Sequence, residues 1–329
     1  MQSDAKHGSI AVIIVNYGTA DLAKNAVESV LAHAPPGRYT SVHIVDNASP
    51  NQDAEKLSKM HADRGWGDQV ILHLESDNHG FGRGNNIALR TLEGASAQPD
   101  YVFLLNPDAQ VKENTLEKLA TVLDQKNEVG FTGASVESDT GEPASSAFRF
   151  PSAFGEFESA FRFGPISRLF SKWVVALPPS QPAGEVDWVT GAAVMARFSA
   201  LKELEYFRPD FFLYYEEVDL MRRAKNKGWR IWYEPAARVV HIEGASTGVK
   251  SGAKEHPRKP AYLYQSWRIY FAANHGRLGA FLAGLAWALG SLGDLIVSKL
   301  RGRTPAVPER YFRDLWSEVF WPLFAPERP

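Results

Sequence analysis

The chain has 329 residues, of which 36 are Lys or Arg and 38 are Asp or Glu, so its formal net charge is −2. Its length suits about two domains, and its 44% apolar and 22% charged residues are typical of a folded globular protein. It contains no cysteine, which excludes disulfides, thiolate metal sites and cysteine nucleophiles. The near-neutral charge argues against a general nucleic-acid-binding protein, so no nucleic-acid partner is expected.

Charge and aromatic residues are unevenly distributed along the chain. Residues 251–329 hold 11 basic and 6 acidic side chains, a net charge of +5, which leaves −7 for residues 1–250. The same segment holds four of the nine tryptophans. No signal peptide is expected, because residues 1–9 are polar and the apolar run 10–15 is too short. We therefore expect a cytoplasmic domain over 1–250 and a basic, aromatic extension over 251–329.

Short apolar runs alternate with helical patterns in the first part of the chain. Strands are expected at 10–15, 42–45, 70–74, 101–105 and 129–132, and helices at 21–33, 52–64, 83–92 and 112–124. This alternation indicates an α/β fold, in which helices cover both faces of a mostly parallel sheet. Ligands of such sheets bind beyond the carboxyl ends of the strands.

The pattern is less regular after residue 132. Residues 133–187 are rich in Phe, Pro, Ser and Gly and lack periodicity, so we expect a long connection that shapes an acceptor pocket. A strand at 192–197, a helix at 216–227 and short strands at 230–233 and 238–241 follow. The first domain thus divides into a regular half, about 10–132, and a less regular half, about 133–250.

Polar residues follow four of the expected strands. They are Asn16 and Tyr17, the segment 46–49, the segment 77–85, and the segment 106–108. Each has a purely structural alternative, because Asp46 and Asp108 could cap helices and the glycines of 80–84 could form a turn. Their occurrence at equivalent ends of one sheet favours a site for a polar ligand.

The glycine cluster does not indicate a dinucleotide site. Residues 80–85 lack the spacing of G-x-G-x-x-G and follow the third strand instead of the first. Asp100, the acidic residue at the expected distance, begins a strand. The chain also lacks a G-x-x-x-x-G-K-[ST] loop and a G-x-S-x-G elbow, which argues against P-loop enzymes and α/β-hydrolases.

Three carboxylates follow the aromatic run 211–215. Glu216 and Asp219 are three residues apart and share a helix face, whereas Glu217 points elsewhere. The structural alternative is that acidic residues stabilise a helix N-terminus. Neighbouring aromatic rings can also exclude water and raise the pKa of a carboxyl group. His241 lies at the end of a strand.

Seven segments carry a family resemblance when they are taken in order. They are VNY at 15–17, VDNAS at 45–49, NHGF at 78–81 with GNN at 84–86, LNPD at 105–108, WVTGA at 188–192, YEEVD at 215–219, and His241. The set resembles family 2 glycosyltransferases, and within them the rhamnosyltransferase-like branch. The resemblance covers about residues 10–248. It implies a GT-A fold with a Rossmann-like sheet, a C-terminal helical extension, and inverting transfer from a nucleotide sugar.

The resemblance implies a donor pocket. Asp46 matches the residue that accepts the N3–H of uracil or thymine, and Tyr17 would contact the base or ribose. Asn106 replaces the first acid of the D-x-D motif and would hydrogen-bond the ribose. The nucleotide pocket would be completed by Asn78, Gly80, Phe81, Arg83 and Asn85. Of these, Arg83 would lie near the diphosphate.

The resemblance also implies a metal and a base. Asp108 and His241 match ligands of a divalent cation, Mg²⁺ or Mn²⁺, which neutralises a diphosphate leaving group. Glu217 occupies the general-base position, where Asp is usual, and Asp219 is the second candidate. The sugar or acceptor pocket would be lined by Trp188, Thr190, Gly191 and Glu216.

We therefore expect an enzyme that transfers L-rhamnose from dTDP-rhamnose. The acceptor would be a hydroxyl of a glycan or a polyprenyl-diphosphate-linked molecule in bacterial cell-surface polysaccharide synthesis. Three alternatives stay open: another UDP- or dTDP-hexose as donor, a nucleotidyltransferase, and a non-catalytic nucleotide-sugar-binding subunit.

The C-terminal extension contains two apolar segments. Residues 278–293 carry no charge but are shorter than the ~20 residues that span a bilayer, so a core or docking helix is favoured over a membrane-embedded one. An i, i+4 stripe runs from Tyr311 to Phe324, and Pro322 is expected to kink or end that helix. The stripe could lie in the inner face of the plasma membrane, which would give peripheral membrane contact through 261–329. The equal alternative is packing on the catalytic domain or on another subunit of a homo-oligomer.

Overall fold

A computed structural model describes residues 8–242 and 256–325 of the protein. The described residues form two compact units. The first unit comprises the described residues within 1–148, 177–209 and 220–251. The second comprises the described residues within 149–176, 210–219 and 252–329. The expected domain boundary at 250/251 lies outside the described residues.

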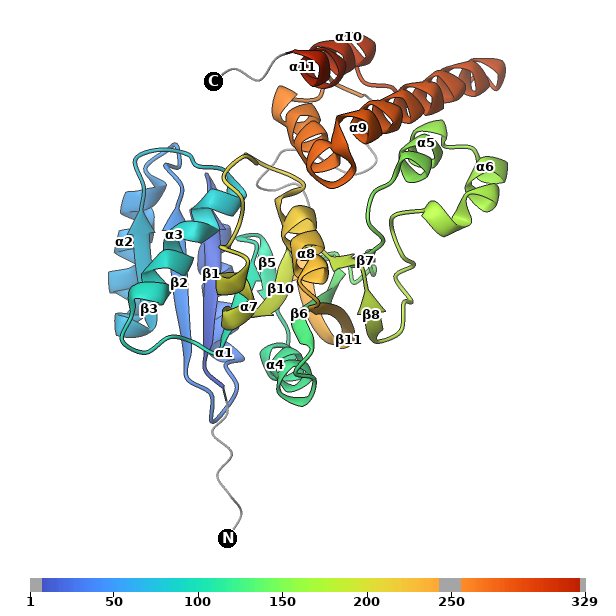
Figure 1. The fold of residues 1–329 in the computed structure, drawn as a ribbon. Coiled ribbons are helices and arrows are strands. Elements are labelled where there is room, and N and C mark those ends of the chain that lie inside the picture. Colours follow the sequence, from blue (N-terminus) through green and yellow to red (C-terminus); the bar gives the residue numbers. More distant parts are fainter. Residues whose placement is uncertain (1–7, 243–255, 326–329) are drawn as a thin grey trace. The chain divides into compact units, whose positions relative to one another are not determined.

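A nine-stranded sheet forms the centre of the first unit (Figure 1). Its strand order is β3-β2-β1-β4-β10-β6-β11-β5, and β8 pairs with β11. The neighbouring strands β3, β2, β1 and β4 are parallel, while β10 runs antiparallel between β4 and β6. The strands are β1 (Ile10–Asn16), β2 (Thr40–Asp46), β3 (Val70–Leu74), β4 (Tyr101–Leu105), β5 (Ala109–Val111), β6 (Val129–Glu137), β8 (Gly184–Val186), β10 (Ala193–Arg197) and β11 (Arg230–His241). A separate two-stranded ribbon pairs β7 (Ala147–Phe148) with β9 (Trp188–Val189).

Helices cover both faces of this sheet. One core cluster joins α1 (Ala20–Ala32), α2 (Asp53–Arg64) and α4 (Thr115–Gln125) to one face. A second cluster joins α3 (Phe81–Gly94), α7 (Phe198–Glu203) and part of α8 (Glu216–Asn226) to the other face. Every residue of β1 is buried, because its side chains alternate between the two clusters. Burial on both faces explains why these strands are uninterrupted apolar runs in the sequence.

The expected strands and helices are present, with local differences. β5 and α7 were not expected, and α4 begins at Thr115 instead of residue 112. The two strands expected at 230–233 and 238–241 are one strand, β11, whose register shifts between Glu234 and Arg238. Pro235 lies inside that shift, where a missing N–H is tolerated because a bulge interrupts the ladder.

Residues 133–187 do not form the expected connection without regular structure. They contain the end of β6, the helices α5 (Ala153–Phe161) and α6 (Gly164–Leu169), and the short 3-10 helix η2 (Ser171–Trp173). The Ser152 side chain accepts a hydrogen bond from the Gly155 N–H and caps α5. Another 3-10 helix, η1 (Gly67–Gln69), precedes β3.

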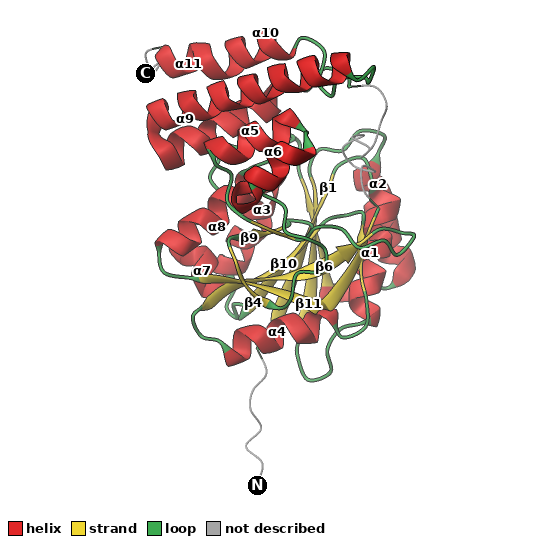
Figure 2. Ribbon diagram, turned by 90° about the vertical axis from the view of Figure 1, so that its right-hand side faces the viewer, coloured by secondary structure: helices red, strands yellow, loops and turns green. Residues whose placement is uncertain are grey.

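The second unit is built around the long helix α9 (Ala261–Leu300), on which α5 and the C-terminal helices pack (Figure 2). The helix is broken at Gly276, where φ is +70°. A Cβ atom at Gly290 would lie 2.5 Å from the carbonyl oxygen of Phe157, so α5 and α9 approach too closely for any other residue there. The C-terminal helices are α10 (Tyr311–Leu315), the π-helical turn η3 (Trp316–Phe320) and α11 (Trp321–Phe324).

Pro322 was expected to kink or end the C-terminal helix, and the helix does depart from α geometry there, in the π-helical turn that precedes the proline. The helix continues to Phe324 because a π-helical turn precedes the proline. Proline cannot donate to the carbonyl four residues earlier, which belongs to Glu318. The Arg268 Nε donates to that carbonyl instead, at 3.0 Å.

Replacing Gly290 by Ala tests the α5–α9 contact. We expect Gly290→Ala to lower the free energy of unfolding by ~1–3 kcal/mol, because the added methyl group meets backbone that cannot move away cheaply. Gly94→Ala is the matched control, since Gly94 also lies in a helix and has nothing within 4 Å of its Cβ position. That control should be neutral or stabilising by up to ~1 kcal/mol. Calorimetric unfolding of both variants measures the difference, and equal transition temperatures would contradict the contact.

Candidate functional site

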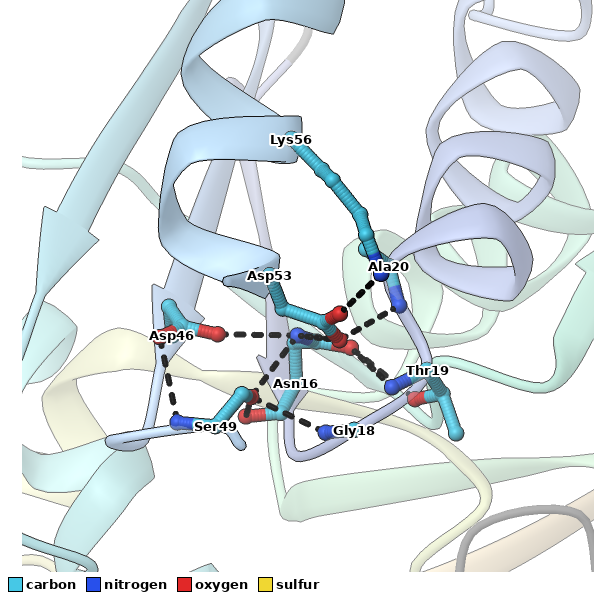
Figure 3. A network of polar contacts seen from close by, with 8 residues as sticks. All are labelled: Asn16, Gly18, Thr19, Ala20, Asp46, Ser49, Asp53 and Lys56. Atoms are coloured by element: carbon cyan, nitrogen blue, oxygen red, sulfur yellow. Dashed lines mark hydrogen bonds and ion pairs between the residues drawn. The ribbon is translucent and has the colours of Figure 1, made fainter. Parts of the chain in front are cut away.

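A buried polar network joins the ends of β1 and β2 to the start of α2 (Figure 3). The Asn16 Nδ2 donates to Asp46 Oδ1 at 2.9 Å and to Asp53 Oδ2 at 3.3 Å. The Asn16 Oδ1 accepts from the N–H and the hydroxyl of Thr19. Asn16 and Asp46 face each other because they are paired residues in the parallel β1–β2 register. One amide side chain therefore fixes two carboxylates and the loop that leads into α1.

Asp53 anchors this network from α2. It accepts hydrogen bonds from the Ala20 N–H and from Lys56, each at 3.0 Å. Burial would raise the pKa of Asp53, but the bonds from Lys56, Ala20 and Asn16 outweigh burial and hold the pKa below its usual value. Asn16 was expected among the polar residues at this edge of the sheet but was given no role, and Asp53 was not among the expected site residues. In the sequence, Asp53 looks like an ordinary acidic residue in the first turn of a helix.

Both carboxylate oxygens of Asp46 accept hydrogen bonds. It is 1% exposed, and besides Asn16 it accepts a hydrogen bond from the Ser49 N–H at 3.3 Å. It does not cap a helix, because α2 begins seven residues later, at Asp53. Asp108 likewise does not cap α4, whose N-cap position is Asn114. The structural alternatives considered for these two aspartates are therefore wrong.

A second set of contacts joins the end of β2 to the loop before α3. The Asn47 Nδ2 donates to Asn78 Oδ1 and to the Gly80 carbonyl, each at 3.0 Å, and the His79 N–H donates to Asn47 Oδ1. Gly80 adopts φ +76° at the N-cap position of α3, a conformation that favours glycine. Asn78 and Gly80 are thus fixed beside Asn47, while Tyr17 is 43% exposed at the end of β1.

The remaining residues expected in the nucleotide pocket contact their own helix or the core. The Arg83 Nε donates to the His79 carbonyl at 2.7 Å, and the Asn85 Nδ2 donates to the Phe81 carbonyl at 3.0 Å. The Phe81 ring packs edge-on against Phe207. Asn85 is only 1% exposed, so its polar atoms lie inside the helix–sheet layer.

Asp108 and His241 meet through a strand pair that the sequence did not reveal. β5 pairs antiparallel with β11, and His241 stands opposite Ala109, the residue after Asp108. The His241 Nε2 lies 3.0 Å from Asp108 Oδ1 and 3.4 Å from Asn106 Nδ2. Asp108 is 3% exposed and the His241 side chain 15%.

This pair has the chemistry of a partial cation site. A carboxylate and an imidazole suit Mn²⁺, and the carboxylate also suits Mg²⁺. Within residues 8–242 and 256–325, no group of three or more His, Asp or Glu side chains could hold a metal ion. Among the described residues, the pair is therefore an incomplete set of ligands. The residues present therefore fit a cation that binds together with a diphosphate.

The segment expected in the sugar or acceptor pocket lies next to Asn106. The Asn106 N–H donates to the Ala192 carbonyl at 3.0 Å, and the Thr190 N–H donates to the Ser146 carbonyl at 3.1 Å. The Trp188 ring stacks on Phe148 with centroids 4.1 Å apart. The short β7–β9 ribbon thus fixes Trp188, Thr190 and the buried Gly191 within the first unit.

The acidic segment belongs to the second unit, at the first turn of α8. Tyr214 and Tyr215 precede it with φ of +69° and +67°, a conformation that is strained for residues other than glycine. Glu216 and Asp219 are buried, whereas Glu217 is partly exposed, as their spacing predicts.

Both glutamates have perturbed pKa values. Burial, and then the negative charge of Glu217, raise the pKa of Glu216 well above its usual value. Burial also raises the pKa of Glu217. The Glu217 Oε2 has no hydrogen-bond partner within the described part of the chain. A carboxylate with these properties suits proton transfer near neutral pH.

Two known enzymes are similar to this chain in sequence. The chain is 28% identical over 268 residues to the N-acetylglucosaminyl-diphospho-decaprenol L-rhamnosyltransferase of Mycobacterium tuberculosis, covering 78% of this chain and 81% of the relative. It is 25% identical over 242 residues to the rhamnosyltransferase WbbL of Escherichia coli, covering 70% and 83%.

A solved structure confirms the expected fold. A mannosyltransferase of Pyrobaculum calidifontis, in complex with GDP-Man and Mn²⁺, matches with a TM-score of 0.57 at 16% identity, over 92% of this chain and 78% of the other. The profile of the family described as glycosyltransferase-like family 2 matches residues 7–259. Because that match spans most of the chain and all of the strand-end segments, the protein belongs to family 2 and is a glycosyltransferase.

Proposed function

We propose that the enzyme transfers L-rhamnose from dTDP-rhamnose, with inversion, to a glycan or polyprenyl-diphosphate-linked acceptor in bacterial cell-surface polysaccharide synthesis. Two relatives are named rhamnosyltransferases, and one of these names a decaprenol-linked acceptor, which supports this choice. The catalytic domain would comprise residues 1–250, with a nucleotide-binding half over about 10–132 and an acceptor half over about 133–250. The extension 251–329 would keep this cytoplasmic enzyme at the inner face of the membrane.

The fixed carboxylate of Asp46 is the observation that carries the donor assignment. Asn16 and the Ser49 N–H hold both of its oxygens, so the carboxylate is oriented before a ligand arrives. An ionised carboxylate is a strong acceptor for the N3–H of thymine or uracil. The N3 atom of cytosine is itself an acceptor and would be repelled. Tyr17 would contact the base or ribose, and the rest of the pocket would comprise Asn78, Gly80, Phe81, Arg83, Asn85 and Asn106.

A change of Asp46 to Asn tests the recognition of the nucleobase. We expect Asp46→Asn to raise the KM for the dTDP-sugar by ~10–100-fold, because a hydrogen bond to a charged group is lost. Wild-type protein should be stabilised thermally by dTDP and UDP more than by CDP. Asp139→Asn makes the same change at an exposed position and serves as the control. Equal stabilisation by all three nucleotides would contradict the role of Asp46.

The identity of the donor sugar is independent of the recognition of the nucleobase. Asp46 would select the pyrimidine and says nothing about the hexose, so another UDP- or dTDP-hexose is the second candidate. The fold likeness extends to an enzyme solved with GDP-Man, which shows that this architecture serves different donors. Turnover with a panel of dTDP- and UDP-hexoses distinguishes the two candidates.

Asp108 and His241 would hold the divalent cation. When bound, Mg²⁺ or Mn²⁺ neutralises the charge that develops on the leaving diphosphate. The 3.0 Å contact between the two side chains keeps both donors at one point before binding. Asn106, 3.4 Å from the imidazole, adds a neutral polar group to the same position.

Chelation and His241→Ala test this assignment. We expect exhaustive chelation to abolish transfer and added Mn²⁺ or Mg²⁺ to restore it. His241→Ala should weaken Mn²⁺ binding by ~10-fold or more, measured by electron paramagnetic resonance in the presence of dTDP. His33→Ala, outside the site, is the control and should bind Mn²⁺ like the wild type. Full activity after chelation would exclude these roles.

Among the three carboxylates, we assign the role of general base to Glu217. Inverting transfer requires a base that removes the proton of the acceptor hydroxyl. Glu217 is partly exposed, whereas Glu216 and Asp219 are buried. Asp219 is the second candidate for the base. Trp188, Thr190 and Gly191 of the first unit would line the sugar or acceptor pocket.

The variant Glu217→Gln tests whether Glu217 is the general base. We expect kcat to fall by ~10²–10⁴-fold at saturating donor, because the amide cannot accept the proton. The base acts when ionised, so activity should rise with pH through the pKa of Glu217. Because burial raises that pKa, the rise should be centred above the usual value of 4.5.

The conservative variant Glu217→Asp should keep this pH dependence at a lower rate. Glu142→Gln removes a carboxylate from an exposed position and should leave turnover unchanged. Near wild-type kcat in Glu217→Gln would move the role to Asp219.

A further inference from the structure

The second half of α9 carries an exposed row of aliphatic side chains. These residues are 40–71% exposed and follow a 4-3-4-3-4 spacing that keeps them on one face of the helix: Leu278, Leu282, Leu285, Leu289, Leu292 and Ile296. We call this face the leucine row. α5 contacts α9 at Gly290, and the C-terminal helices contact it at Gly284, on other sides of the helix. The leucine row therefore stays uncovered within the second unit.

The C-terminal helices, which pack on α9, also carry exposed aromatic side chains. Phe312, Trp316, Trp321 and Phe324 are 45–66% exposed. Phe281 connects the two parts: it precedes Leu282 in α9, and its ring centroid lies 5.5 Å from that of Phe324. Tryptophan and phenylalanine at the margin of an aliphatic surface are typical of the region between lipid headgroups and acyl chains.

The exposed charges around this surface are predominantly basic. Of the four acidic side chains within residues 256–325, Asp294 and Asp314 are buried, Glu318 is partly exposed and only Glu309 is exposed. Asp314 is 3% exposed and pairs with Arg258 at 2.8 Å. Asp294 is 6% exposed and accepts hydrogen bonds from Ser298 and the Ala306 N–H. The exposed cations are Arg277 at the start of the leucine row, Lys299, Arg301 and Arg303 after its end, and Arg310 and Arg313 on the C-terminal segment.

We propose that the leucine row and the exposed aromatic residues of the second unit bind the surface of an anionic lipid bilayer, with the second half of α9 lying in the plane of the interface. Aliphatic residues would enter the acyl-chain boundary, and the surrounding cations would pair with anionic headgroups. The inference depends on neither the donor nor the acceptor of the reaction.

A spanning orientation does not agree with the packing of α9. By length and composition, α9 is the one helix of the described residues that could cross a membrane, with a mean hydropathy of 1.7 over its most apolar 18 residues. However, 33% of that stretch is buried against the protein. Crossing would also take Asp294 and its polar partners into hydrocarbon, which is costly.

A second copy of the chain fits the surface less well than lipid does. The spacing of the leucine row resembles the core of a coiled coil, in which the flanking positions usually carry charges that fix the partner. Here the flanking positions are Phe281, Ala286 and Ala288, and residues 278–293 carry no charge. Charge complementarity therefore favours an anionic bilayer.

Co-sedimentation of the full chain with vesicles tests the proposal. We expect the protein to bind vesicles that contain phosphatidylglycerol more tightly than pure phosphatidylcholine vesicles, and added salt to weaken that preference. Lys299→Gln with Arg303→Gln should reduce binding to anionic vesicles by about fivefold per charge. Equal binding of this variant and the wild type would overturn the electrostatic part of the proposal.

Variants of the leucine row test the aliphatic part. Leu282→Glu with Leu289→Glu should reduce vesicle binding by about tenfold or more and leave the unfolding temperature unchanged, since both residues are about half exposed. Leu74→Glu is the matched control, because Leu74 is 50% exposed, like Leu289, but lies in the first unit. Vesicle binding of that control should equal that of the wild type.

The oligomeric state in solution separates lipid from a second copy. We expect a monomer by analytical ultracentrifugation without vesicles. A dimer that the double glutamate variant converts to monomer, with no change in vesicle binding, would overturn the proposal. Transfer to a water-soluble acceptor should be equal in wild type and variant. This readout keeps a failure of the membrane proposal distinct from a failure of the proposed reaction.

Discussion

The amide side chain of Asn16 is the contact on which the candidate nucleotide site depends. It lies between the carboxylates of Asp46 and Asp53, both almost fully buried. Two carboxylates in such surroundings repel each other and lose hydration, a cost that hydrogen bonds from Asn16, Lys56 and backbone N–H groups offset. Because the partners come from β1, β2 and α2, the network fixes three elements at the edge where ligands of parallel sheets bind.

The second half of the site depends on backbone pairing. β11 is long enough to pair with β6 along most of its length and then with β5, and the β5 register places His241 next to Asp108. The two side chains are 133 positions apart in the chain, yet their atoms lie 3.0 Å apart. The ladder holds the backbones of these two residues side by side, so that their side chains meet at one point.

The sides of α9 differ in the size of the residues that they present. Toward α5 and the C-terminal helices it presents glycines, which permit backbone approach within a few ångströms. On its remaining side it presents large aliphatic residues to solvent, which an ordinary monomeric surface rarely does over such an extent. In the second half of α9, the buried residues are mostly small and the exposed ones are large and aliphatic, which indicates that the exposed side has a partner outside the unit.

The sequence by itself determined the alternation of buried strands and helices and the polar residues that follow β1, β2, β3 and β4. Strands buried on both faces must be uninterrupted apolar runs, and that pattern is local. Only the tertiary structure decided the contacts of Asn16 and Asp53 and the strand pairing through which Asp108 and His241 meet, although the family resemblance had implied that these two residues lie together. β5, at three residues, is too short to produce a period, and α5 packs its phenylalanines on elements far away in the chain. Contacts between distant segments depend on register and crossing distance, which no local pattern of residues encodes.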